Sequence, residues 1–547
     1  MVRDARQTLE EVAVGMVLTQ DQPFGPPDAE GLFVLSSANA FQLIDRTNKV
    51  FARASAQRPM YVVGRKGAGK TAFLLGSLLD SGIPHEVLSS ANVYSKYLGF
   101  TRRFAERHAP LFADQLADIW SAIFDHVAIY HVCHTAAASD AGTDLQVIWD
   151  YLPGSSVTDR TATQVAEQVI AHMKELCDEL PPGADLSELL EHLRRGGRSY
   201  LEASRALHGI VERRRSRVVI LMDNLEDLHS RLDEVRPALQ GLFRCVGRAA
   251  TDDRRHDFDV ELCMPSEPFE EIQALSANPE KDFRNILPIY WSARELLHLA
   301  SDRLEHHLDA HHPDELRALR RVAGARSPQD GAALLRAALP PIVRNGLLID
   351  EDPIAYLLRH TQLLPRHMIE LLNSVFSLHR NDSHPWAVTA ESLVAGTRLA
   401  ERTIVQGVLN AYSGNFPELR QGIAALANRL PIRFGASHLR KVFNQAGVRK
   451  STGLEFYEFL QMLFTVGVVG VCTGETARYY QAQFQYTFPG PLTAVEGEDD
   501  LCLHPLFTRH LLSQSLGRLA GKTKVTYPYG SDPEGDYRLD LGYVGAN

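Results

Sequence analysis

A glycine-rich octapeptide at residues 64–71, GRKGAGKT, has the composition and spacing of a phosphate-binding loop. Its three glycines let the main chain approach a polyphosphate closely, so that successive backbone N–H groups can surround the anion. The Lys70 ammonium would neutralise the outer phosphates, and the Thr71 hydroxyl would ligate Mg²⁺. The sequence therefore predicts an ATP and Mg²⁺ site whose phosphate cradle consists of Gly64, Arg65, Lys66, Gly67, Ala68, Gly69, Lys70, Thr71 and Ala72.

An acid at the end of a buried strand is the second part that such a site needs. The apolar run VVILM ends at Asp223, which would hold the metal together with the loop hydroxyl. The next residue is Asn224, and its amide is a very poor base at a place where an acid commonly polarises the attacking water. Glu226 is the candidate for positioning that water, with Asp227 as the alternative. These residues predict that the nucleotide is bound and that its hydrolysis is slow or stimulated by a partner. They do not decide whether the protein is an effective ATPase.

Alternating strands and helices must position these groups. The glycine loop follows a short apolar strand and precedes an apolar helix, as the motif requires. Strands separated by helices predict an α/β fold, a parallel-sheet P-loop core with helices on both faces. The predicted strands are residues 61–63, 84–89, 218–222, 258–265 and 285–291.

The rest of the chain is predicted to be largely helical, with one later change of pattern. Three short helices at 417–429, 436–446 and 453–465 precede two strands around a glycine-containing turn, which is a winged-helix pattern. The expected domains are an N-terminal extension (1–36), the core (37–295) with a helical insertion at about 96–200, a helical lid (296–400), the winged helix (401–520) and a polar tail (521–547).

The winged-helix pattern raises the question of DNA binding. The helix that would enter the major groove carries Glu455 and Glu458, which phosphates repel, and Gln461 is its one plausible base reader. A small basic patch could lie beside it, made of Arg440, Lys441, Arg449 and Lys450. Nucleic acid is therefore an alternative partner, and a protein-docking role is the preferred one.

Composition sets wider limits. The chain has 547 residues with a formal net charge of −10, which does not favour a general nucleic-acid binder. Its six cysteines form no CxxC pair, so neither a zinc site nor a disulfide framework is indicated, and a reduced cytoplasmic location is expected. The sequence contains no apolar run of about 18 residues, so no membrane span is expected.

His307 and His311 lie one helical turn apart, but a third metal ligand is not spaced convincingly.

The segments YVVGRKGAGKTAF, VVILMDNLED, ILPIYWSARELLHLASDRL, LLPRHMIELLN and DDLCLHPLFTRHL occur in this order over residues 60–520. In this respect the chain resembles bacterial P-loop ATPases of the AAA+/STAND branch, and more distantly origin-recognition initiator ATPases with a C-terminal winged helix. The resemblance implies that Arg366 is a sensor arginine that meets the γ-phosphate, and that Ser266 occupies a polar sensor position. Asn224 departs from the family pattern, which puts turnover in doubt rather than binding.

Two functions follow as expectations. The first is a nucleotide-dependent switch or assembly factor, working as a homo-oligomer or with a separate effector protein; the resemblance extends this to bacterial antiphage defence. The second is an initiator- or repair-type ATPase that uses its winged helix on duplex DNA. A steep salt dependence of DNA binding would distinguish the second from the first.

Overall fold

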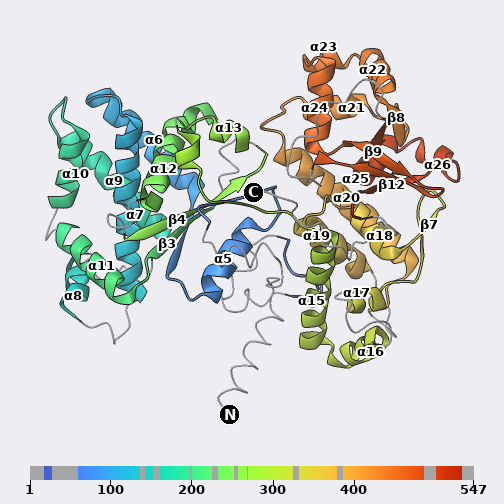
Figure 1. The fold of residues 1–547 in the computed structure, drawn as a ribbon, viewed down its shortest axis with the longest axis horizontal. Helices are drawn as coiled ribbons and strands as arrows, with labels where there is room; N and C mark the ends of the chain where they lie inside the picture. The colour runs from blue at the N-terminus through green and yellow to red at the C-terminus, as the bar shows by residue number, and fades with distance from the viewer. Residues whose placement is uncertain are drawn as a thin grey trace. The chain divides into compact units, whose positions relative to one another are not determined.

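The computed structural model of the chain describes residues 18–27, 59–135, 142–151, 160–195, 200–223, 232–251, 257–267, 269–276, 278–324, 332–378, 386–485 and 500–531 (Figure 1). The contacts divide the chain into two compact units. The α/β unit comprises Arg46–Lys66 and Lys70–Ile289, and the C-terminal unit comprises Tyr290–Asn547 with Met1–Asp45 and Gly67–Gly69.

The α/β unit is built on a five-stranded sheet with the order β2-β3-β4-β1-β5, in which all neighbouring strands are parallel. Side chains along β1 and almost all of those along β3 and β4 are buried, as expected for central strands covered on both faces. The prediction of an α/β fold with a parallel sheet is thereby confirmed. The strands are β1 (Tyr61–Gly64), β2 (His85–Ser89), β3 (Val218–Asp223), β4 (Phe258–Pro265) and β5 (Ile286–Pro288).

The strand order fixes where this sheet can bind a ligand. The connection that leaves β1 leads to the β2 edge, whereas the connection that leaves β4 leads to β5 at the opposite edge. Open parallel sheets usually bind ligands at the carboxyl ends of neighbouring strands whose connections run to opposite edges, as those of β1 and β4 do. The glycine loop follows β1 at this end of the sheet.

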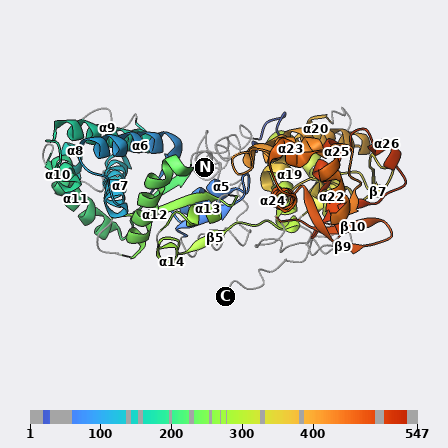
Figure 2. The ribbon, with the colours of Figure 1, turned by 90° about the horizontal axis from the view of Figure 1, so that it is seen from above.

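Helices fill the long interval between β2 and β3. Figure 2 shows α8 to α11 gathered beside α7, and their contacts agree with that view. The long helix α7 is buried over most of its length because it also packs against α12 and the sheet. The helices of the unit are α5 (Lys70–Asp80), α6 (Ser90–Arg107), α7 (Ala113–Thr135), α8 (Thr143–Tyr151), α9 (Ala162–Glu179), α10 (Leu186–Arg195), α11 (Tyr200–Arg214), α12 (Leu232–Thr251), α13 (Phe269–Gln273) and α14 (Pro279–Asp282).

Two contacts show how closely α7 is held. Trp120 stacks on Tyr97 with ring centroids 4.5 Å apart, and its Nε1 donates to the Ala238 carbonyl at 2.9 Å. Gly241 of α12 faces Leu116 of α7, and a Cβ added at Gly241 would lie 2.6 Å from the Leu116 Cβ. The glycine is therefore required for the close approach of these two helices.

A buried histidine between α7 and α8 makes the stability of this unit depend on pH. His126 Nδ1 lies 2.6 Å from the Ala122 carbonyl, so this nitrogen donates, and Nε2 accepts from the Tyr151 hydroxyl at 2.7 Å. Burial lowers the pKa of His126 to about 4. Between pH 6.5 and pH 4 the unfolded chain therefore binds a proton that the folded chain does not, and stability should fall by up to about 3 kcal/mol as pH drops through this window.

Melting temperatures of the wild type and of His126→Gln between pH 7 and pH 4 check this expectation. Acidification should lower the melting temperature less in the variant than in the wild type. Equal slopes for the two proteins would show that His126 does not carry this pH dependence.

The C-terminal unit starts with a helical region and ends in a second sheet. Its helices are α15 (Ala293–His311), α16 (Pro313–Gly324), α17 (Ala333–Ala338), α18 (Pro353–Arg359), α19 (Pro365–Leu378), α20 (Ala390–Ala411), α21 (Leu419–Ala425), α22 (Ala436–Gln445), α23 (Val448–Thr452), α24 (Phe456–Val466), α25 (Pro505–Leu512) and α26 (Leu516–Leu519). Its strands are β6 (Val343–Arg344), β7 (Asp350–Glu351), β8 (Arg433–Gly435), β9 (Val469–Glu475), β10 (Tyr479–Gln483), β11 (Asp500–Leu503) and β12 (Val525–Pro528).

The second sheet has the order β12-β10-β9-β11-β8, and β9 and β10 form the expected antiparallel pair. Helices α21 and α22 fall within their predicted segments and α24 ends one residue beyond its segment, whereas the short helix α23 was not predicted. Composition suggested a polar tail from residue 521, but β12 is a buried strand there that pairs in parallel with β10.

Among the described residues, no helix is long and apolar enough to cross a bilayer. Residues 37–54, whose sequence also has a helical pattern, lie outside the described residues.

Candidate functional site

The glycine loop joins the end of β1 to the start of α5, in the strand–loop–helix order that the sequence predicts. Gly67 and Gly69 have φ values of +86° and +82°, which side chains with a Cβ rarely adopt. Helix α5 begins at Lys70, so its free N–H groups lie at the carboxyl end of β1. The loop therefore has the backbone form and the helix end that favour an anion.

The predicted metal pair meets across the sheet. The Thr71 hydroxyl donates to Asp223 Oδ2 at 2.7 Å, although 152 residues separate the two in sequence. Strand β4 lies between β1 and β3, so the contact joins the helix after one strand to the end of the second strand along. A hydroxyl and a carboxylate are oxygen ligands that suit Mg²⁺. The pair fits an Mg²⁺ ion because a small movement could place the cation between the two oxygens.

Lys70 is buried and points back along the loop. Its Nζ donates to the Gly64 carbonyl at 3.0 Å and to the Arg65 carbonyl at 3.3 Å. The ammonium group therefore donates to neutral carbonyls of its own loop. A polyphosphate would offer it negatively charged oxygens, which are stronger acceptors.

Two residues after β4 hold the loop from the sheet side, Ser266 through its main-chain amide and Glu267 through its side chain. Glu267 Oε1 accepts from the Lys66 amide at 3.0 Å, and the Ser266 amide donates to the Gly64 carbonyl at 3.1 Å. The Ser266 hydroxyl lies 3.5 Å from Glu267 Oε2. Glu267 was not among the predicted site residues. Its position just after a buried strand was the signal that could have found it, because the ends of β1 and β4 meet at one sheet edge.

The middle of the loop, Gly67–Gly69, groups with the C-terminal unit. Within that unit the Arg366 amide donates to the Gly67 carbonyl at 3.4 Å, and the Arg366 Nε donates to the Pro27 carbonyl at 3.2 Å. Trp291 Nε1 donates to the Ala68 carbonyl at 2.8 Å. Arg366 lies in the first turn of α19, and neither its contacts nor those of Trp291 could be read from the sequence.

The groups expected to act on water lie outside the described residues. These are Asn224, Glu226 and Asp227, which follow the end of β3 directly. Their roles remain predictions.

His307 and His311, the histidine pair with metal-ligand spacing, make hydrogen bonds in the structure. His307 Nδ1 lies 3.1 Å and His311 Nε2 lies 2.7 Å from the same Leu18 carbonyl. A carbonyl only accepts, so both nitrogens carry protons and neither of them presents a lone pair to a metal. The pair anchors residue 18 to α15 in this structure.

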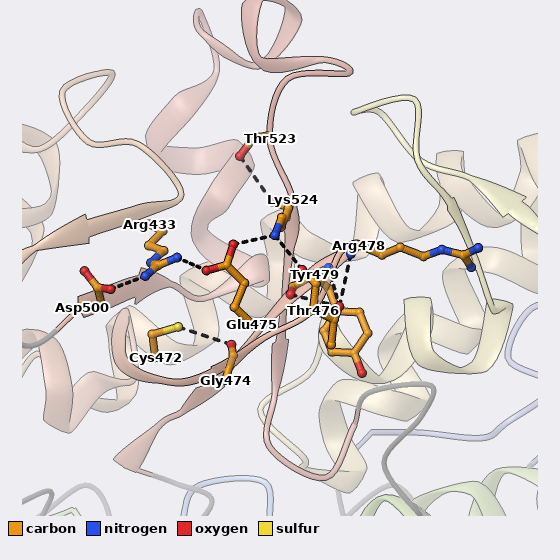
Figure 3. A network of polar contacts seen from close by, with 10 residues as sticks. All are labelled: Arg433, Cys472, Gly474, Glu475, Thr476, Arg478, Tyr479, Asp500, Thr523 and Lys524. Carbon is orange, nitrogen blue, oxygen red and sulfur yellow. Dashed lines mark hydrogen bonds and ion pairs between the residues drawn. The ribbon is translucent and has the colours of Figure 1, made fainter.

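A network of ion pairs covers one end of the C-terminal sheet (Figure 3). Arg433 lies between Glu475 and Asp500 and pairs with both. Lys524 pairs with Glu475 at 2.5 Å. These two cations are compensated by acids of the same sheet, so the network offers little net positive charge to a phosphate backbone.

Two arginines of the basic patch expected near α24 also contact neighbouring side chains of the same unit. Arg449 pairs with Glu455 at 2.5 Å, and the Arg440 guanidinium lies over the Phe456 and Tyr457 rings. Glu458 accepts from the Glu455 amide at 2.8 Å in a capping box. The two acids therefore have local structural roles at the start of α24.

Cys472, beside the network in Figure 3, should be the most reactive thiol. A hydrogen bond from the Cys502 thiol, and then the charge of Arg433, lower the pKa of Cys472 to about 7. Cys472 and Cys133 are partly exposed and the other four cysteines are buried, while burial raises the pKa of Cys133. Alkylation by iodoacetamide should therefore reach half its maximal rate near pH 7 at Cys472.

Peptide mass spectrometry of the alkylated protein measures this rate for each cysteine. Arg433→Gln should move the midpoint to higher pH. A midpoint near pH 9 in the wild type would contradict the assignment.

Comparison with known proteins adds no family to this geometry. No protein-family model matches the chain, and no curated protein matches it.

Proposed function

We propose that the chain binds ATP with Mg²⁺ at the glycine loop and acts as a nucleotide-dependent switch or assembly factor. The observation that carries the proposal is the 2.7 Å hydrogen bond from Thr71 to Asp223 beside the loop. It supports the proposal because the glycine loop, the buried Lys70 and the Thr71 and Asp223 oxygens lie at the same edge of a parallel sheet, where an anion and its cation would be bound.

In this proposal each described residue has a distinct task. The loop amides and the start of α5 bind the β- and γ-phosphates, and Lys70 leaves its carbonyl partners to neutralise them. Thr71 and Asp223 would hold Mg²⁺, which supplies charge neutralisation between phosphates when it is bound. Glu267 would release the Lys66 amide so that this donor can face the nucleotide.

The switch would depend on residues that report the γ-phosphate. Arg366 is proposed for this role because a guanidinium can distinguish ATP from ADP by one charged group. The helical lid (296–400) and winged helix (401–520) remain proposals for the parts that move or dock a partner. By resemblance alone, a bacterial defence system with a separate effector protein is the proposed setting.

Hydrolysis is proposed to be slow because Asn224 stands where a second acid is usual. Glu226→Gln should lower ATP turnover at least about tenfold while leaving ATP affinity unchanged, since general-base assistance contributes about 100-fold or more. Phosphate release and calorimetry measure the two quantities separately. Unchanged turnover would assign the water to another group, with Asp227 next to test.

Assembly can be tested by mass photometry with and without a non-hydrolysable ATP analogue. The switch proposal expects the mass distribution or the partner affinity to change only when the analogue is present. A protein that binds the analogue without either change would be a nucleotide-binding protein but not a switch.

The alternative is an initiator- or repair-type ATPase acting on duplex DNA. The engagement of Arg433, Arg440 and Arg449 by acids or aromatic rings of the same unit weighs against it. Duplex binding that weakens steeply as salt rises, together with DNA-stimulated turnover, would favour this alternative.

A further inference from the structure

Three side chains with metal-binding chemistry converge where β2 meets α7. Glu86 lies on β2, the edge strand of the parallel sheet, and His131 and His134 lie one turn apart on α7. One ligand atom from each residue lies within 4.8 Å of the other two. The side chains of Glu86, His131 and His134 are 15%, 8% and 29% exposed, so the group is largely buried and His134 is its most exposed member.

The contacts of the His134 ring require a positive charge between its Nε2 atom and Glu86. His134 Nδ1 lies 3.1 Å from the Tyr130 carbonyl, and since a carbonyl only accepts, Nδ1 carries the proton. The neutral ring then presents its Nε2 lone pair to Glu86 Oε1 at 3.4 Å. A lone pair facing a carboxylate oxygen is repulsive unless a proton or a metal cation lies between them.

We propose that Glu86, His131 and His134 bind a divalent transition-metal ion, with Zn²⁺ as the first candidate. Tetrahedral zinc with bonds of about 2.0–2.2 Å to nitrogen and oxygen places neighbouring ligand atoms about 3.4 Å apart. The distance from His134 Nε2 to Glu86 Oε1 already has this value. His131 Nδ1 lies 2.7 Å from the same oxygen and donates its proton to it. Metal binding would release this proton to solvent and open the Nδ1–Oε1 distance by about 0.7 Å.

The surroundings fit the same assignment. The Tyr130 carbonyl fixes the His134 tautomer, which is the usual task of a residue behind a metal-ligating histidine. Two imidazoles and a carboxylate suit zinc and its neighbours, whereas Ca²⁺ and Mg²⁺ prefer oxygen ligands alone. Three protein ligands leave a fourth position for water or for a ligand from outside.

The proposed metal site is separate from the glycine loop. Glu86 is paired with Ile220, three positions before the Ser89–Asp223 pair at the carboxyl edge of the sheet, which is about 10 Å along the strand. A metal there would fasten the edge strand β2 to α7, and thus the sheet to the helices inserted between β2 and β3. This inference does not depend on nucleotide binding.

The test is a metal titration of the full chain after chelator treatment and desalting. Co²⁺ should give the visible absorption of a tetrahedral site, and Zn²⁺ should displace it at one equivalent. His134→Ala and Glu86→Gln should each weaken Zn²⁺ binding at least about tenfold, because each removes a ligand. His172→Ala is the matched control, since His172 faces Glu175 in an exposed pair on another helix, and it should bind Zn²⁺ as the wild type does.

Circular dichroism of each variant shows whether the fold is retained, which is expected because His134 is partly exposed and alanine favours helices. Failure of the wild type to bind Zn²⁺ at tens of micromolar would overturn the proposal and assign an imidazolium–carboxylate pair instead. Binding that survives His134→Ala but is lost in His311→Ala would also overturn it, because the metal would then lie on α15.

Discussion

Replacing Lys70 with alanine should weaken ATP binding by about 100-fold, which corresponds to about 3 kcal/mol. The side chain is buried, and its Nζ lies 3.0 Å from the Gly64 carbonyl at the start of the loop. In the proposed site Lys70 is the cation next to the outer phosphates, and alanine would remove it. Isothermal titration calorimetry of wild type and variant with Mg·ATP measures the difference.

Lys96→Ala is the matched control for this measurement. Lys96 is a half-exposed lysine of the same unit that pairs with Glu167 at 2.6 Å, and exposed pairs contribute little. The control should bind ATP like the wild type. Equal affinity in Lys70→Ala and the wild type would refute the phosphate role of the loop.

Replacing Arg359 with alanine should destabilise the C-terminal unit by about 3–5 kcal/mol. Arg359 Nε and Nη2 donate to the two Glu351 oxygens at 2.8 and 2.9 Å, and the side chains are 8% and 2% exposed. Tyr527 of β12 donates to the same carboxylate at 2.5 Å. Without the guanidinium the Glu351 charge would stay buried and uncompensated, so the unit should melt about 10 °C lower.

Arg344→Ala is the control, because Arg344 faces Asp350 at 3.8 Å in an exposed ion pair, and Asp350 directly precedes Glu351. Its loss should cost less than about 1 kcal/mol. Differential scanning calorimetry compares the two variants. A melting temperature for Arg359→Ala within 2 °C of the control, a margin of about 1 kcal/mol, would show that the buried pair does not hold this unit together.

The parallel sheet was predictable because its strands are short apolar runs bounded by turns and helices. The Thr71–Asp223 contact followed from the same pattern, since a hydroxyl after one strand and an acid at the end of another meet at the carboxyl edge. The strand order was not predicted, because local sequence does not determine which apolar strands become neighbours.

Contacts between distant, individually ordinary residues could not be predicted. The position of Glu267 just after a buried strand indicates the sheet edge where it lies, but not that its side chain accepts from the Lys66 amide. Glu86 lies 45 residues before His131, so the two histidines spaced by three residues were the only local signal of that cluster. The strand β12 was not predicted because its tyrosine and proline lie in a polar, glycine-rich segment, where composition suggests a tail.

Calorimetry of the unmodified protein with Mg·ATP shows whether the glycine loop is a nucleotide site. Calorimetric titration with ATP should give one site per chain, and affinity should fall when Mg²⁺ is removed or when Asp223 is replaced with asparagine. A titration with no saturable binding up to millimolar ATP, in the presence of Mg²⁺, would contradict the account.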